Sequence, residues 1–151
     1  DLRAQHVIEL GTRTGVSTVA WLYGLEQTGG RLTSIDLDPK PPIGDHSRWT
    51  FIQGDDMDPT IVGALDPAEV VFIDTSHLYA HTVAELNTYR WLVRPGGFIV
   101  LHDTMLAEPE GSRPGDPRFP VRKAVEEFSA QTGFRWHNFP ECNGLGVIRV
   151  G

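Results

Sequence analysis

Short apolar runs alternate along this chain with segments in which apolar residues recur every three or four positions. Short apolar runs bounded by turn-forming residues are typical of buried strands, whereas the wider spacing indicates amphipathic helices. This pattern predicts strands at residues 6–10, 31–36, 49–53, 70–73 and 98–101, and helices at 16–27, 59–65, 78–93 and 121–131. In the first helix, the residues expected to face the core are Val16, Val19, Ala20, Leu22, Tyr23 and Leu25.

Two segments depart from this alternation. Residues 37–48 contain three prolines and a glycine, so we expect a loop there in place of a crossover helix. Near the C-terminus, two strand-like runs at 134–139 and 145–150 are separated by a turn-like segment at 140–144, which is typical of a hairpin. The predicted fold is an α/β Rossmann-like doubly wound sheet of seven strands, mostly parallel, with an antiparallel C-terminal hairpin strand.

The length and composition predict one domain over residues 1–151. A chain of 151 residues with 40% hydrophobic content can bury one ordinary core. Residues 105–120 are rich in proline and glycine, and a long loop of this kind in a compact domain indicates a lid or substrate loop. The first strand begins almost at once, so either the domain is minimal or N-terminal elements are missing.

The net charge, the cysteine content and the length of the apolar runs limit the partners and the location that we expect. A formal charge of -7 without any block of lysine or arginine disfavours nucleic acid. A single cysteine, Cys142, cannot form an internal disulfide, and no run reaches the roughly 18 apolar residues of a membrane span. We therefore expect a cytoplasmic protein with a small-molecule substrate, and the possibility of a homo-oligomer stays open.

A glycine-spaced turn connects the first strand to the first helix. Gly11 and Gly15 allow a tight turn and close approach of the backbone to a ligand, and the helix that starts near Ser17 offers free N–H groups to a carboxylate or phosphate. Arg13 stands where a dinucleotide fingerprint has its middle glycine, which disfavours a nicotinamide enzyme. The turn therefore predicts a site for a nucleotide-like ligand.

Acidic residues follow the apolar runs of all five predicted parallel strands. In open α/β sheets, ligands bind beyond the carboxyl ends of the strands, so these acids are expected to share one rim. The acids of this rim are Glu9, Asp36, Asp55, Asp56, Asp74 and Asp103.

These motifs, in this order, resemble the class I S-adenosylmethionine-dependent methyltransferases, and the resemblance extends from Val7 to Val150. The segment 9–15 is similar to the first motif, 34–38 to the ribose-binding strand end, 53–55 to the turn beside the adenine, and 92–100 to the motif after a late helix. The resemblance implies that S-adenosylmethionine is the cofactor. The cofactor-binding residues that it implies are Glu9, Gly11, Thr12, Gly15, Ser17, Asp36, Leu37, Gly54, Asp55, Asp56 and Asp74.

A narrower resemblance concerns the chemistry. Residues 72–79 and 101–104 are similar to metal-dependent small-molecule O-methyltransferases of the catechol type and of the cephalosporin-hydroxylase-like and sugar-tailoring group. There, an aspartate after the fourth strand and one after the fifth hold a divalent cation, which implies Asp74 and Asp103 as ligands of Mg²⁺ or another divalent cation. Thr104 stands where the catechol type has an asparagine ligand, so it is the candidate third ligand and that position stays open.

His77 is the candidate general base. It lies three residues after Asp74, where the catechol type has its catalytic lysine and related groups often have histidine. An imidazole can accept a hydroxyl proton near neutral pH. A histidine that only caps or packs a helix start is the alternative. His81 is interpreted as a surface residue, and His102 as a packing residue that points away from Asp103.

The sequence thus predicts cation-assisted O-methylation of a small-molecule hydroxyl by an S-adenosylmethionine-dependent enzyme. Two alternatives stay open, a metal-independent small-molecule methyltransferase and a non-catalytic cofactor-binding domain. An oxidoreductase ranks third because of Arg13. The sequence does not identify the methyl acceptor.

Overall fold

The predicted strands and helices assemble into the expected doubly wound sheet. The structure is a computed structural model that describes residues 3–106 and 121–151. Within these residues, the strands are β1 (His6–Leu10), β2 (Arg31–Asp36), β3 (Trp49–Gln53), β4 (Ala68–Ile73), β5 (Val93–His102), β6 (Trp136–Phe139) and β7 (Leu145–Arg149). The helices are α1 (Val16–Glu26), α2 (Pro59–Gly63), α3 (Tyr79–Tyr89) and α4 (Val121–Thr132).

In the described part of the chain, the seven strands form one sheet in the order β3-β2-β1-β4-β5-β7-β6. Strands β1 to β5 pair in parallel, and β7 pairs antiparallel with both β5 and β6. The predicted fold class, including the antiparallel hairpin strand, is confirmed. The predicted lid loop falls largely on residues 107–120, which lie outside the described residues.

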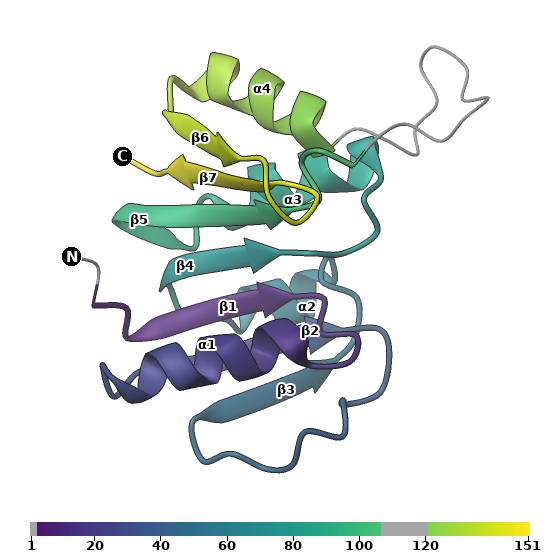
Figure 1. Ribbon diagram of the computed structural model, residues 1–151, viewed down its shortest axis with the longest axis vertical. Coiled ribbons are helices and arrows are strands. Elements are labelled where there is room, and N and C mark those ends of the chain that lie inside the picture. The colour runs from purple at the N-terminus through teal and green to yellow at the C-terminus, as the bar shows by residue number, and fades with distance from the viewer. Residues whose placement is uncertain (1–2, 107–120) are drawn as a thin grey trace.

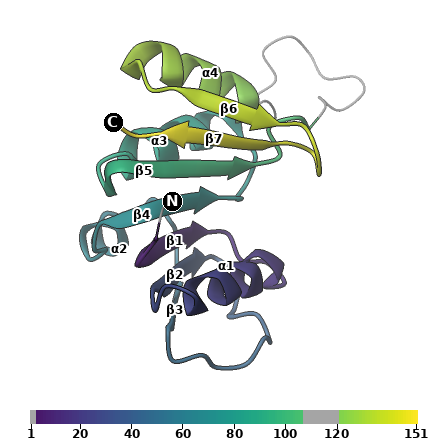
Figure 2. The ribbon, with the colours of Figure 1, turned by 60° about the vertical axis from the view of Figure 1, so that its left-hand side comes forward.

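Alternation along the buried strands sends side chains to two separate cores. On one face, Ile8 and Leu10 pack with residues of α3 and α4 and with the partly buried side chains of α2. On the other face, Val7 packs with Leu22 and Leu25 of α1. Figures 1 and 2 show α1 on one side of the sheet and α2 and α3 on the opposite side. None of the helices in the described residues is both long and apolar enough to cross a membrane.

Helix α1 buries only part of the stripe that its apolar residues predict. Val16 and Tyr23 are 78% and 72% exposed, whereas Thr18, Leu22 and Leu25 are buried. A polar contact adds Thr18 to the buried side, because its hydroxyl donates a hydrogen bond of 2.8 Å to Glu9 on β1.

Strand β5 begins earlier than expected and includes the segment 94–97 that was predicted to precede it. Its pairing with β4 changes register between Ala68 and Val70, and this irregularity accommodates Pro95 and the left-handed Gly96. A Cβ atom on Gly97 would lie 2.5 Å from the carbonyl oxygen of Glu69 on the neighbouring strand, so glycine is required at this position.

Candidate active site

The carboxyl ends of β1 to β5 lie along one edge of the sheet, as the arrowheads in Figure 1 show. The parallel pairing brings this about, because Leu10 pairs with Ile35 on one side and with Ile73 on the other. The residues that follow these strands therefore meet at a common rim. The rim divides into a glycine turn after β1 and a group of charged side chains after β4 and β5.

The glycine turn fits tightly against the end of β4. Gly11 has φ +85°, and a Cβ atom there would lie 2.1 Å from the backbone oxygen of Asp74. Gly15 also has φ +85° and occupies the N-cap of α1, where no side chain caps the helix. The first N–H groups of α1 are thus available to an anionic ligand such as an amino-acid carboxylate.

Asp36, at the end of β2, holds the glycine turn through its carboxylate. One oxygen accepts hydrogen bonds from the backbone N–H of Thr12 at 2.6 Å and of Arg13 at 3.0 Å. The other oxygen accepts one from the N–H of Asp38 at 2.9 Å. Burial opposes ionisation of Asp36, but these hydrogen bonds outweigh it and lower the pKa of the carboxyl group. The carboxylate is therefore charged at neutral pH and fixes the shape of the turn.

Glu9 lies beneath the turn rather than on its surface. The residue is 0% exposed and accepts hydrogen bonds from Ser17 at 2.7 Å, Thr18 at 2.8 Å and Ser34 at 2.5 Å. Burial raises the pKa of its carboxyl group despite these donors. Glu9 thus anchors the start of α1, and direct contact of Glu9 or Ser17 with a cofactor stays a prediction.

The predicted adenine side of the rim follows β3. The N–H of Gly54 donates to the backbone oxygen of Asp36 at 2.8 Å, which ties this turn to the end of β2. Asp55 accepts a hydrogen bond from the N–H of Met57 at 2.8 Å. Leu37 is 71% exposed beside this turn, whereas Asp56 is buried. Leu37 is thus available to a ligand and the Asp56 side chain is already engaged within the protein.

Four side chains after β4 and β5 form a group that we call the strand-end cluster: Asp74, His77, His102 and Asp103. The Nε2 atom of His77 lies 2.8 Å from Asp103 Oδ2 and 3.2 Å from Asp74 Oδ1. The Nδ1 atom of His102 lies 3.2 Å from Asp103 Oδ1 and 3.7 Å from Asp74 Oδ1. The hydrogen bond to Asp74 raises the pKa of His77 against the effect of burial, and the Asp103 charge adds to the increase. The expected convergence of Asp74, His77 and Asp103 is thus present.

The backbone explains why His102 joins this cluster, contrary to the expectation that it points away from Asp103. Asp103 has φ +58°, a left-handed conformation that breaks the alternation of side chains at the end of β5. Its carboxylate consequently turns to the same side as the His102 ring. His77 also has a positive φ, +56°, directly across the cluster. Sequence reasoning missed His102 because nothing in the chain marks Asp103 as left-handed.

The Thr104 side chain is buried and hydrogen-bonded within the protein, whereas a metal ligand needs a free oxygen at the site. It is 3% exposed, and its hydroxyl donates a hydrogen bond of 2.5 Å to Asn138 on β6. A Cβ atom on Gly144 would lie 2.5 Å from the same hydroxyl oxygen, so the β6–β7 turn packs closely on it. The structure directs Thr104 into the hairpin and supplies His102 as the third potential donor beside Asp74 and Asp103.

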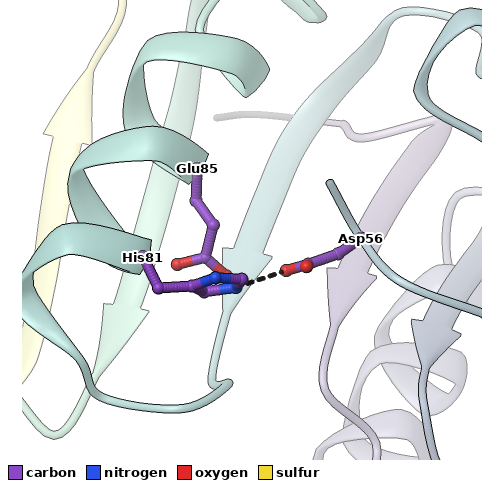
Figure 3. Close-up of side chains that lie close together, drawn as sticks. All are labelled: Asp56, His81 and Glu85. Atoms are coloured by element: carbon purple, nitrogen blue, oxygen red, sulfur yellow. Dashed lines mark hydrogen bonds and ion pairs between the residues drawn. The ribbon is translucent and has the colours of Figure 1, made fainter. Parts of the chain in front are cut away.

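A second charged group, the α3 cluster, consists of Asp56, His81 and Glu85. Figure 3 shows the His81 ring beside the Glu85 carboxylate and directed toward Asp56. Its Nε2 atom lies 3.2 Å from Asp56 Oδ2 and 3.3 Å from Glu85 Oε1. Hydrogen bonds to Asp56 and then to Glu85 raise the pKa of His81 to about 10, whereas burial raises the pKa of Glu85. His81 is therefore a charged, half-buried residue, and its interpretation as a surface histidine is wrong.

The α3 cluster connects the turn after β3 to the loop after β4. The Thr75 hydroxyl donates a hydrogen bond of 2.7 Å to Glu85 Oε1, and Thr75 directly follows Asp74. The Tyr89 hydroxyl donates to the backbone oxygen of Asp56 at 2.6 Å. Helix α3 thereby links the turn after β3 to the loop that carries Asp74 and His77. Only the spacing of His81 and Glu85, one helical turn apart, could have indicated this cluster in the sequence.

The strand-end cluster fits a divalent cation. Asp74, His102 and Asp103 each offer a ligand atom, and these atoms lie within 4.8 Å of one another. His102 Nδ1 and Asp103 Oδ1 are buried and have no hydrogen-bond partner among the described residues. Buried polar atoms without partners are costly, so their presence at one point indicates a ligand.

Comparison with known proteins identifies similar sequences and folds. A family model described as a methyltransferase domain matches residues 8–104. Among curated proteins, the O-methyltransferase ankF of Aspergillus thermomutatus is 22% identical over 175 aligned positions, which cover 99% of this chain and 72% of that protein.

Two solved structures show the same fold. Cofactor-bound Rv0187 from MTB has a TM-score of 0.77 and 22% identity, and the alignment covers 98% of this chain and 73% of that one. The MycE methyltransferase of the mycinamycin pathway, in complex with Mg, SAH and mycinamycin VI, has a TM-score of 0.77 and 21% identity. That alignment covers 97% of this chain and 44% of MycE.

Proposed function

The chain belongs to the methyltransferase-domain family, and we propose that it transfers the methyl group of S-adenosylmethionine to a hydroxyl of a small molecule with the help of a divalent cation. The observation that carries this proposal is the convergence of Asp74, His77 and Asp103 beside the glycine turn. The name of the ankF relative and the Mg and SAH of the MycE complex support it.

The glycine turn and the end of β2 would hold the cofactor. The uncapped N-terminus of α1 suits its amino-acid carboxylate, and Asp36 lies where a ribose would meet the turn. When bound, S-adenosylmethionine supplies an electrophilic methyl group on a sulfonium. The tight contact between Gly11 and Asp74 places this turn directly against the strand-end cluster. Cofactor and acceptor would therefore meet at the ends of β1 and β4.

Asp74 and Asp103 would hold the cation, and His77 would take the proton. When bound, a divalent cation fixes the acceptor oxygen and lowers the pKa of its hydroxyl. In the transfer, the acceptor oxygen forms a bond to the methyl carbon, the carbon–sulfur bond breaks, and the hydroxyl proton moves to Nε2 of His77. The base would be the neutral form of His77. The two carboxylates raise the pKa of the ring, and a cation bound to them would offset their charge and favour that neutral form. Correct orientation of the reacting atoms would provide much of the acceleration.

Calorimetric titration with S-adenosylhomocysteine, with and without Mg²⁺, tests the cofactor and the cation together. We expect binding by the wild-type protein and tighter binding with a cation, an effect that Asp103→Asn removes. Asparagine suits this position because it tolerates a positive φ. Failure of the wild-type protein to bind S-adenosylhomocysteine would refute the proposal.

Transfer of a radiolabelled methyl group to a panel of catechols, sugars and other hydroxyl compounds tests catalysis. Activity that survives chelation would favour a metal-independent methyltransferase. A non-catalytic domain would be favoured if the protein bound the cofactor, transferred no methyl group to any compound of the panel, and showed the same cofactor affinity after His77→Asn. His137→Asn is the matched control, because His137 is an exposed histidine on β6. The cytoplasmic location and any homo-oligomeric assembly remain predictions.

A further inference from the structure

The donor atoms of the strand-end cluster are not those of an ordinary magnesium site. Asp74 and Asp103 offer carboxylate oxygens, but the third potential donor is a ring nitrogen, Nδ1 of His102. Mg²⁺ prefers oxygen ligands throughout and retains several waters, whereas imidazole nitrogen suits transition-metal dications. The chemistry of the third donor therefore bears on which cation the site selects.

The His102 nitrogen faces the same space as an unpartnered carboxylate oxygen. Nδ1 of His102 and Oδ1 of Asp103 are 3.2 Å apart, but neither has a hydrogen-bond partner among the residues that the structure describes. The two atoms are therefore close together without being hydrogen-bonded to each other. Asp74 Oδ1 completes the group at 3.7 Å from His102 Nδ1. Three donor atoms thus lie around one position. His77 Nε2 shares Asp74 Oδ1 with this group, but on Asp103 it contacts the other oxygen, Oδ2.

The fold fixes His102 in this position. His102 is the last residue of β5 and pairs with Leu145 of β7, so its backbone is held within the sheet. The left-handed Asp103 then turns its carboxylate back toward the ring. Thr104 was the candidate third ligand, but its hydroxyl donates a hydrogen bond to Asn138. His102 Nδ1 has no hydrogen bond to give up in order to act as a ligand, whereas Thr104 would have to leave its own.

We propose that His102 is a nitrogen ligand of the catalytic cation and makes the site selective for transition-metal dications such as Mn²⁺, Fe²⁺ or Co²⁺ over Mg²⁺. This inference rests on the proposed function, because it concerns the same cation site. Two carboxylate oxygens and one imidazole nitrogen leave positions open for the acceptor oxygen and water. His102 is thus a determinant of metal specificity that distinguishes this chain from an all-oxygen site.

Metal binding to the purified protein tests the inference without any need for turnover. We expect Mn²⁺ and Co²⁺ to bind at least about 100-fold more tightly than Mg²⁺ in calorimetric titrations, following the order of affinities for nitrogen-containing sites. His102→Asp replaces the nitrogen by a carboxylate oxygen and should reduce this ratio to about tenfold or less. Equal affinities for Mn²⁺ and Mg²⁺ in the wild-type protein would overturn the inference.

The electron spin echo of bound Mn²⁺ identifies the ligand directly. We expect nitrogen modulation in the wild-type protein and in His77→Asn, and its loss in His102→Asn. Modulation that disappears in His77→Asn but persists in His102→Asn would show that the other histidine is the ligand and would overturn the inference. If His102 variants do not fold, His77→Asn still decides the question, because nitrogen modulation that persists in His77→Asn excludes His77 as the nitrogen ligand. Titration with S-adenosylhomocysteine in the absence of metal separates failure of this inference from failure of the proposed function. Binding of S-adenosylhomocysteine without nitrogen modulation would refute the role of His102 alone, whereas absence of binding would refute the proposed methyltransferase function.

Discussion

Replacement of His81 by glutamine tests whether the α3 cluster stabilises the fold through a charged imidazole. In the wild-type protein, Nε2 of His81 lies 3.2 Å from Asp56 and 3.3 Å from Glu85, and Glu85 is 0% exposed. Glutamine preserves a hydrogen-bond donor but removes the positive charge. Two carboxylates are then left facing each other, and one of them is completely buried.

The expected loss can be worked out from the pKa of His81. An increase from the ordinary value of 6.5 to about 10 corresponds to at most about 5 kcal/mol. The His81 side chain is 28% exposed, and the burial of Glu85 works against the charged cluster, so we expect His81→Gln to lower the free energy of unfolding by about 2–3 kcal/mol at pH 7. The control, His46→Gln, removes a partly exposed contact of 3.7 Å to Glu26 and a hydrogen bond of 3.2 Å that the His46 ring accepts from the N–H of Arg48, and it should cost less than about 1 kcal/mol.

Urea unfolding at several pH values provides the measurement. The pKa of His81 is higher in the folded protein, so its stabilisation is complete below about pH 6.5 and is lost as the pH rises through about 10. The difference between wild type and His81→Gln should therefore shrink between pH 7 and pH 10. Adding Glu85→Gln to His81→Gln should recover at least about 1 kcal/mol, because the buried charge is removed. A single variant as stable as the His46→Gln control, or a double variant no better than the single one, would refute this reasoning.

Further predictions concern the glycine turn and the base. Gly11→Ala should destabilise the fold by more than about 3 kcal/mol in urea unfolding, because its Cβ would lie 2.1 Å from the Asp74 carbonyl oxygen. Gly24→Ala, with no atom within 4 Å of the added Cβ in α1, should stabilise it by up to about 1 kcal/mol. Asp36→Ala should weaken S-adenosylhomocysteine binding in calorimetry and cost about 1–2 kcal/mol of stability. That contribution is present above pH 3.8 and is lost as the pH falls through the lowered pKa. His77→Asn should reduce kcat by about 10²- to 10⁴-fold in methyl-transfer assays and leave cofactor affinity unchanged.

The sheet and the glycine turn could be predicted because their signals are local. Buried parallel strands appear as continuous apolar runs, and Gly11 and Gly15 occur where a positive φ is required. The prediction of a methyltransferase came from the order of these motifs and is confirmed by the family match over residues 8–104. The stripe predicted for α1 was right for Leu22 and Leu25 but wrong for Val16 and Tyr23, which are exposed. The contact from Thr18 to Glu9 on the buried side is a tertiary contact that the hydrophobic pattern does not encode.

The remaining parts of the site depend on tertiary contacts that periodicity does not encode. His81 meets Asp56 only because α3 packs beside the turn after β3. His102 meets Asp103 only because one residue after β5 adopts a left-handed backbone. Aspartate tolerates that conformation better than most residues, but it occupies many others as well, so the sequence gives no sign of it. Both features become visible only when the strands and α3 are placed together.

The two left-handed residues also indicate why the α3 cluster matters to the site. His77 and Asp103 face each other with φ values of +56° and +58°, a conformation that costs free energy in residues other than glycine. Such backbone persists only where its surroundings hold it on both sides. The sheet holds Asp103 through the pairing of His102 with Leu145, and the hydrogen bond from Thr75 to Glu85 anchors the loop that carries His77. Loss of the charge on His81 should therefore loosen the position of the proposed base as well as destabilise the fold, because Glu85 serves both clusters.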